Sequence, residues 1–125
     1  MNSVWGLAVD SALQRLYVTI PSGGFIGNFT GLEVLDSTTG AFTAQIPSGQ
    51  PPVAPPGLDA SAESVVVNAA THHVFFEDAG NGTVTVVDGL TNKALATLVT
   101  GTRAQGLAVD AAAGVGGSIP SLATI

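Results

Sequence analysis

The sequence contains no cysteine and very little positive charge. Without cysteine the chain has no disulfides, thiolate metal sites or cysteine nucleophiles. Its basic residues are Arg15, Lys93 and Arg103, which stand against nine acidic residues and leave a formal net charge of −6. Three scattered cations cannot form the basic surface that nucleic-acid binding requires, so we expect no nucleic-acid partner.

Long apolar stretches and helical patterns are also missing. Nothing approaches the roughly 20 apolar residues of a membrane-spanning helix, so we expect no membrane span, and the first residues lack the features of a signal peptide. Sixteen glycines and seven prolines instead separate short runs of small and β-branched residues. This composition predicts an all-β chain.

One pentapeptide, GLAVD, occurs at 6–10 and again at 106–110, and a degraded copy ends at Asn68. Each copy opens a unit of short β-patterned runs. The predicted strands of the first two units are 5–10, 16–20, 32–36 and 42–46, then 64–68, 74–77, 83–88 and 94–99. Asp10 corresponds to Asn68 and Asp36 to Asp88, while Asn68 and Asp110 lie 42 residues apart (110 − 68). Four short strands in a period of this length are typical of a propeller blade.

The predicted fold is therefore all-β, a partial β-propeller of consecutive four-stranded antiparallel meander blades. Blade 1 covers 4–49 with an inserted glycine-rich loop at 21–31, a proline-rich connecting loop covers 50–63, and blade 2 covers 64–101. An incomplete blade 3 covers 105–125, where the pattern of a second strand is lost after residue 110. Within blade 2, Asn81-Gly82 predicts a type I′ hairpin turn.

The motifs resemble the YVTN-type β-propeller repeat. In the first unit the likeness lies in GLAVD at 6–10, RLYVTI at 15–20, the STTG turn after Asp36 and the exit IPSG at 46–49. In the second unit it lies in GTVTVVD at 82–88, TNK at 91–93 and the exit LVTG at 98–101. The likeness covers roughly residues 4–110, with departures at Ile20, where the family has Asn, and at Phe75-Phe76 in place of Tyr-Val.

The resemblance implies a closed propeller, usually seven-bladed, of a kind often exported by bacteria or archaea. An extracytoplasmic location is suggested by the resemblance alone, and it implies no single activity because fold does not dictate function. Even a four-bladed ring needs roughly 168 residues at this period, more than the 125 present. We therefore expect a fragment of a longer propeller; assembly from several chains and an eroded or frame-shifted reading frame are the alternatives.

Five residues recur at the ends of predicted strands: Asp10, Asp36, Asn68, Asp88 and Asp110. We interpret them as structural turn residues whose side chains accept backbone N–H groups. Asparagine at one of the five positions supports this interpretation, because an amide keeps the hydrogen bond and loses the charge. The alternative is a calcium site, which requires several converging oxygen ligands.

His72 and His73 form the only histidine pair and are weak candidates for metal binding. On a strand they would point to opposite faces, so that one of them could meet Glu77 or Asp78. The competing interpretation is a solvated hairpin turn, since the sequence supplies no recognisable third ligand. We expect no cofactor.

The glycine-rich loop carries three large apolar residues, Phe25, Ile26 and Phe29. It follows a strand without opening a helix and has no phosphate-binding lysine, so a nucleotide site is not indicated. The loop either contacts a ligand over a propeller face or packs over its own blade.

No nucleophile–base pair is apparent, and no catalytic residue is assigned. The sequence favours a non-catalytic scaffold or binding module whose partners are the remaining blades or another copy of the chain, with a protein or small-molecule ligand. The alternative is a piece of a propeller enzyme, a lactonase-like hydrolase or a haem- or quinone-dependent oxidoreductase, whose active site lies mostly in other blades.

Overall fold

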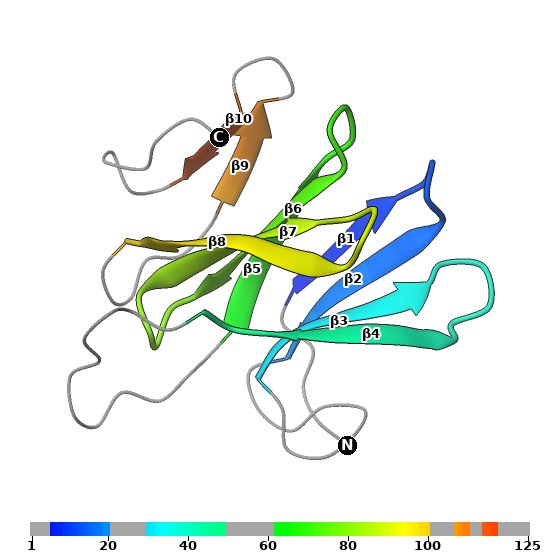
Figure 1. Cartoon of the computed structure of the whole chain (residues 1–125), viewed down its shortest axis with the longest axis horizontal. Coiled ribbons are helices and arrows are strands. Elements are labelled where there is room, and N and C mark those ends of the chain that lie inside the picture. Colours follow the sequence, from blue (N-terminus) through cyan, green and yellow to red (C-terminus); the bar gives the residue numbers. More distant parts are fainter. Residues whose placement is uncertain (1–5, 21–29, 50–61, 101–106, 111–113, 118–125) are drawn as a thin grey trace.

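The computed structural model describes residues 6–20, 30–49, 62–100, 107–110 and 114–117, and within these ranges every regular element is a strand (Figure 1). Two four-stranded antiparallel meander sheets follow one another along the chain, with strand orders β1-β2-β3-β4 and β5-β6-β7-β8, and β9 pairs with β10 in a hairpin. The fold is all-β and resembles part of a β-propeller. The strands are β1 (Gly6–Asp10), β2 (Arg15–Ile20), β3 (Gly31–Asp36), β4 (Phe42–Pro47), β5 (Ala62–Asn68), β6 (His73–Asp78), β7 (Thr83–Asp88), β8 (Lys93–Val99), β9 (Leu107–Asp110) and β10 (Gly114–Gly117).

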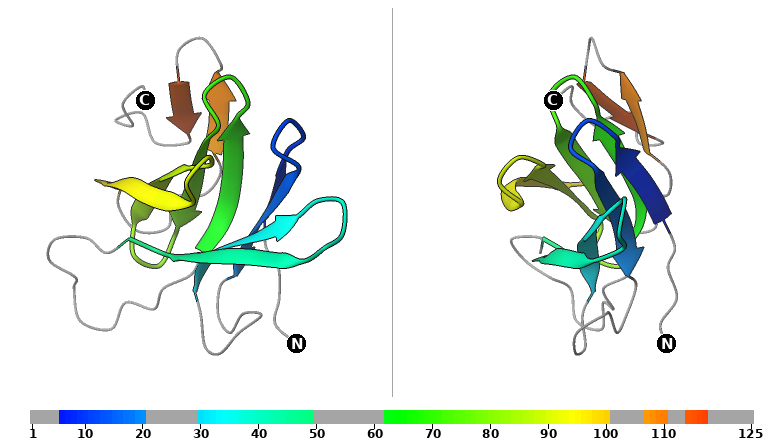
Figure 2. Two further views of the ribbon diagram at one scale, coloured as in Figure 1. Left: turned by 45° about the vertical axis from the view of Figure 1, so that its right-hand side comes forward. Right: turned by 90° about the vertical axis from the view of Figure 1, so that its right-hand side faces the viewer.

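The first strands of successive units lie side by side. β5 packs against β1 on one side and against β9 on the other (Figures 1 and 2). β4 and β8 are the last strands of their sheets. This arrangement, with first strands adjacent and each sheet running outward from them, is that of neighbouring blades in a propeller.

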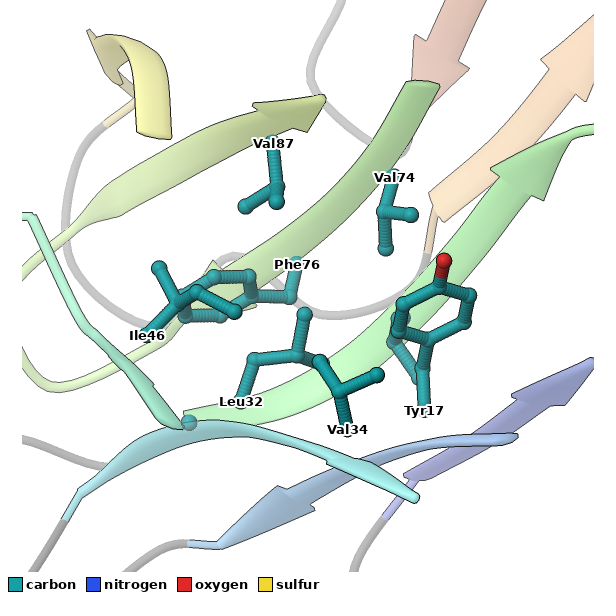
Figure 3. Close-up of a cluster of buried hydrophobic side chains, with 9 residues drawn as sticks. Tyr17, Leu32, Val34, Ile46, Val74, Phe76 and Val87 are labelled. Carbon is teal, nitrogen blue, oxygen red and sulfur yellow. The ribbon is translucent and has the colours of Figure 1, made fainter. Parts of the chain in front are cut away.

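The main core lies between the two four-stranded sheets. Because alternate residues of a strand point to opposite faces, Leu32 and Val34 of β3 face the second sheet together, and Val74 and Phe76 of β6 face the first (Figure 3). The complete cluster is Tyr17, Leu32, Val34, Ile46, Ala62, Val65, Val74, Phe76 and Val87. Packing of sheet against sheet is therefore what joins the two units.

The third unit corrects one sequence expectation. The pattern predicted no second strand there, yet Gly114–Gly117 forms β10 and pairs antiparallel with β9, with Gly117 opposite Leu107. Three of its four residues are glycine, which lowers strand propensity, but a strand ladder is built from backbone groups and does not need side chains.

The predicted type I′ turn at Asn81-Gly82 is wrong. A type I′ turn requires positive φ at both central residues, and here Gly82 has a φ of 70° while Asn81 is not among the residues with positive φ. The loop instead spans four residues, 79–82, and the Gly82 N–H donates to the Asp78 carbonyl oxygen at 2.8 Å. The side chain of Asp78 stabilises this longer turn by accepting the Asn81 N–H at 2.9 Å.

Candidate functional site

The two sheets are joined at one edge by a polar contact between the turns that follow β1 and β5. Asp10 ends β1, and its Oδ2 lies 2.5 Å from Nδ1 of His72 in the second sheet. Its other carboxylate oxygen accepts the N–H groups of Ala12 and Leu13 at 3.1 and 3.3 Å. The buried carboxylate of Asp10 therefore has two roles. It closes its own turn, and it binds the neighbouring blade.

Arg15, the first residue of β2, makes a second polar contact across the same edge. Its guanidinium donates to the carbonyl oxygen of Gly89 and to Oδ1 of Asn92, the latter at 2.7 Å. Asn92 has a φ of 58°, a left-handed conformation that asparagine tolerates better than most residues. We call the four side chains of Asp10, Arg15, His72 and Asn92 the interblade latch.

Tyr17 is fully buried close to the latch, and its phenol oxygen has no hydrogen-bond partner among the described residues. The turn at Gly89 passes so close that an added Cβ would lie 2.9 Å from this oxygen and 2.5 Å from the His72 carbonyl oxygen. Burial raises the pKa of Tyr17, an effect that the nearby Arg15 guanidinium opposes. The hydroxyl therefore lies beside Arg15 without a hydrogen bond of ordinary geometry to a described residue.

Tyr17→Phe is accordingly expected to preserve the fold and to leave the free energy of unfolding unchanged or increased by about 1 kcal/mol. Phe75 already occupies the corresponding place in the second blade. Since the folded state raises the phenol pKa above 10.0, wild-type stability is complete below that pH and falls as the pH rises beyond it. Urea titrations at neutral and alkaline pH should show this fall in the wild type only.

The chain contains a single tyrosine, so the ultraviolet absorbance of the phenolate reports Tyr17 alone. We expect this titration to be shifted upward in the folded protein and to return to the ordinary value in denaturant. A loss of about 2 kcal/mol in Tyr17→Phe, or an ordinary phenol pKa in the folded protein, would contradict the unpartnered hydroxyl.

The strand-end residues accept backbone N–H groups in the turns that follow them. Oδ1 of Asp36 accepts from Thr38 and Thr39 at 2.8 and 3.0 Å, and these bonds lower the pKa of Asp36. Asn68 accepts from Ala70 at 3.0 Å and Asp88 from Leu90 at 2.9 Å. Asp110 ends β9, and its side chain lies outside the described residues. Asp78, which the sequence suggested as a metal partner, belongs to the same class of turn residue.

The histidines do not meet the predicted metal partners. His72 lies in the turn with a φ of 61°, not on the strand, and its side chain reaches Asp10 instead of Glu77 or Asp78. The ring of His73 packs edge-on against Phe75, with ring centroids 6.4 Å apart. Within the described ranges no three His, Asp or Glu side chains come together as a metal site would require.

A second interblade contact, at the end of β4, was not anticipated from the sequence. The N–H of Gly49 donates to Oγ1 of Thr85 at 2.9 Å, and Oγ1 of Thr83 donates to the Gly49 carbonyl oxygen at 2.9 Å. A Cβ at Gly49 would overlap the side chain of Thr97. Two features of the sequence could have indicated this contact. Threonine occurs at alternate positions, 83 and 85, of one predicted strand, and glycine ends both repeat units, at 49 and 101.

The remaining predicted site residues, Phe25, Ile26 and Phe29, lie outside the described residues, and their contact with a ligand stays a prediction.

No protein-family model matches the chain, and no curated protein matches it. Among the residues that the structure describes, none forms a helix long and apolar enough to cross a membrane. The interblade latch and the contacts of Gly49 both connect one blade to the next.

Proposed function

We propose that the chain is a non-catalytic segment of a YVTN-type β-propeller that serves as a scaffold or binding module, and that its first sheet packs against a further blade. The observation that carries the proposal is the face of the first sheet turned away from the second, which we call the open face. At five matched positions it carries apolar residues, as does the face with which the second sheet covers the first.

The correspondence follows from the repeat. Five apolar residues of the second sheet face the first sheet: Val65, Val67, Val74, Phe76 and Val87. At the matching positions of the repeat, the open face also carries apolar residues, which in the same order are Leu7, Val9, Leu16, Val18 and Leu35. Val65 is 8% exposed where the first sheet covers it, whereas Leu7 is 65% exposed. Val9 is 54% exposed as well, whereas Val18 is already buried at 5%, so the uncovered part of this face lies at β1. Large exposed apolar side chains that lie together indicate a missing partner.

The partner that fits is a blade presenting the face that carries Tyr17, Leu32 and Val34, because this is the face that covers Val65 and its neighbours within the chain. In a propeller such a blade would precede the first sheet around the axis. Its polar contacts would differ from those of the interblade latch, since Gln14 and Gly40 stand where the second blade has His72 and Asn92.

The proposal is tested by adding the missing blade. A copy of residues 4–63 fused ahead of the full chain supplies one further blade with its own connecting loop. We expect the fused chain to unfold at higher urea concentration than the chain alone, and we expect the β1 amides to gain protection from hydrogen exchange. If the open face is not a docking surface, the added copy will leave the exchange of β1 unchanged.

Leu7→Asp provides the control. In the chain alone it changes an exposed residue and should shift stability by no more than about 0.5 kcal/mol. In the fused chain it places a charge inside the new interface, so the gain in stability and the protection of β1 should both disappear. An equal effect of Leu7→Asp in the two proteins would contradict docking at this face.

A further inference from the structure

We propose that the outer edge of the second sheet, strand β8, pairs antiparallel with β8 of a second copy of this chain and forms a dimer by extending the sheet. This surface is separate from the open face of the first sheet, so the inference does not depend on the proposed function.

β8 is the outer edge strand of the second sheet as far as the structure describes it. It is one of the longest strands, its residues 93–97 and Val99 are exposed, and Leu95 and Val99 are 54% and 61% exposed. Edge strands of this length are usually protected by proline, by inward-pointing charge or by short length. β8 contains no proline, and its single charge is Lys93 at one end. Its one irregularity is a bulge at Leu95, where the register against β7 shifts between Val86 and Val87.

The matching strand of the first blade carries the protection that β8 lacks. Thr43 of β4 corresponds to Leu95, and Pro47 corresponds to Val99, so both exposed apolar positions of β8 have a polar or hydrogen-bond-blocking counterpart. Proline at this place leaves the fold intact, because the Ser48 N–H still donates to the Thr30 carbonyl oxygen at 3.2 Å. The second blade makes the same bond one residue after Val99, from Thr100 to Gly82 at 2.8 Å.

Among the described residues no strand pairs with the outer side of β8. In an antiparallel pair, successive residues direct their N–H and C=O groups alternately toward and away from the partner strand. The Thr100 N–H points to β7, so Val99 and Thr97 direct their N–H and C=O groups outward. These groups are the ones that an added strand would meet.

The edge is self-complementary in one register. If Thr97 pairs with Thr97 of the second copy, Val99 lies opposite the bulged residue Leu95 in both directions. Threonine pairs and pairs of apolar residues are favourable across strands, and Lys93 falls outside the paired segment, so no like charges meet. This two-fold arrangement, in which each copy offers the same surface, is the commonest form of homodimer. A second copy is therefore the occupant that the sequence of β8 fits.

Sedimentation velocity of the whole chain over a range of concentrations tests the dimer. We expect the wild type to be a dimer that dissociates on dilution. The double variant Leu95→Thr/Val99→Pro gives β8 the residues of β4 and should raise the dissociation constant by about tenfold or more. Leu7→Thr alters the open face and should leave the dissociation constant unchanged.

A cross-link tests the register and covers the case in which the double variant fails to fold. The chain has no cysteine, so Thr97→Cys introduces the only thiol, placed on the two-fold axis. We expect it to form a covalent dimer on oxidation, whereas Thr43→Cys on the exposed part of β4 should not. A monomeric wild type at all concentrations, an unchanged dimer in the double variant, loss of the dimer in Leu7→Thr, or equal cross-linking of the two cysteine variants would overturn the proposal.

Discussion

Val86→Asp is expected to unfold the chain. Val86 is 2% exposed and packs with Phe75 and Val84 on the face of the second sheet turned away from the first. A carboxylate placed there without a partner costs several kcal/mol, a large part of the roughly 5–15 kcal/mol by which a domain of this size is stable. Circular dichroism should show loss of the β-sheet signal, or a urea midpoint shifted far toward zero.

Two controls distinguish buried charge from the general effect of aspartate. Leu7→Asp changes a residue that is exposed in the chain alone, and we expect a change of about 0.5 kcal/mol or less. Val86→Ala creates only a cavity and should cost less than Val86→Asp. If Val86→Asp and Leu7→Asp gave similar stabilities, the second sheet would not be buried on the Val86 face.

Asp10→Ala is expected to give the second largest effect, a loss of about 3 kcal/mol in the free energy of unfolding. The buried carboxylate of Asp10 accepts two N–H groups of its own turn and binds His72 across the interface, and its removal leaves these partly buried groups without their partner. Asp36→Ala removes an exposed carboxylate that closes the corresponding turn of β3 and β4 without a described contact to the second sheet, so its loss should be much smaller.

A double-mutant cycle isolates the contact between the blades. His72→Asn keeps a residue that tolerates the left-handed backbone but shortens the side chain so that it no longer reaches Asp10. We expect a coupling energy of about 1 kcal/mol or more between Asp10→Ala and His72→Asn in urea unfolding. Additive effects would show that the two side chains stabilise their own turns independently.

The sequence predicts the repeat, the eight strands of the first two units and their meander order, because hydrophobic alternation and turn residues are local signals. The GLAVD motif and the strand-end residues are sufficient for this. β10 could not be predicted, since three glycines give no side-chain pattern. The type I′ turn was wrong because Asp78, three residues before Asn81, accepts a hydrogen bond from its N–H and stabilises a longer loop.

The contacts between blades could not be predicted from the sequence for a different reason. Asp10 and His72 are 62 positions apart, and nothing in the sequence indicates which turn meets which. The sequence indicated either a solvated turn or a metal site near Glu77 for His72, and neither interpretation anticipated its contact with Asp10 of the first sheet. The contact of Gly49 with Thr83 and Thr85 likewise depends on the packing of one sheet on the other.

The interblade latch also bears on how the chain folds correctly. Sheets with similar apolar faces are at risk of docking in the wrong order, within one molecule or between two. Apolar packing alone distinguishes such faces poorly, but the latch depends on a residue that the repeat does not preserve, because the uncharged Asn68 occupies the place of Asp10 at the next junction. A blade docked in the wrong order would leave Asp10 and Arg15 without their partners. The polar contacts of the latch therefore form only between the first and second blades, and they favour this pairing over the others while the chain folds.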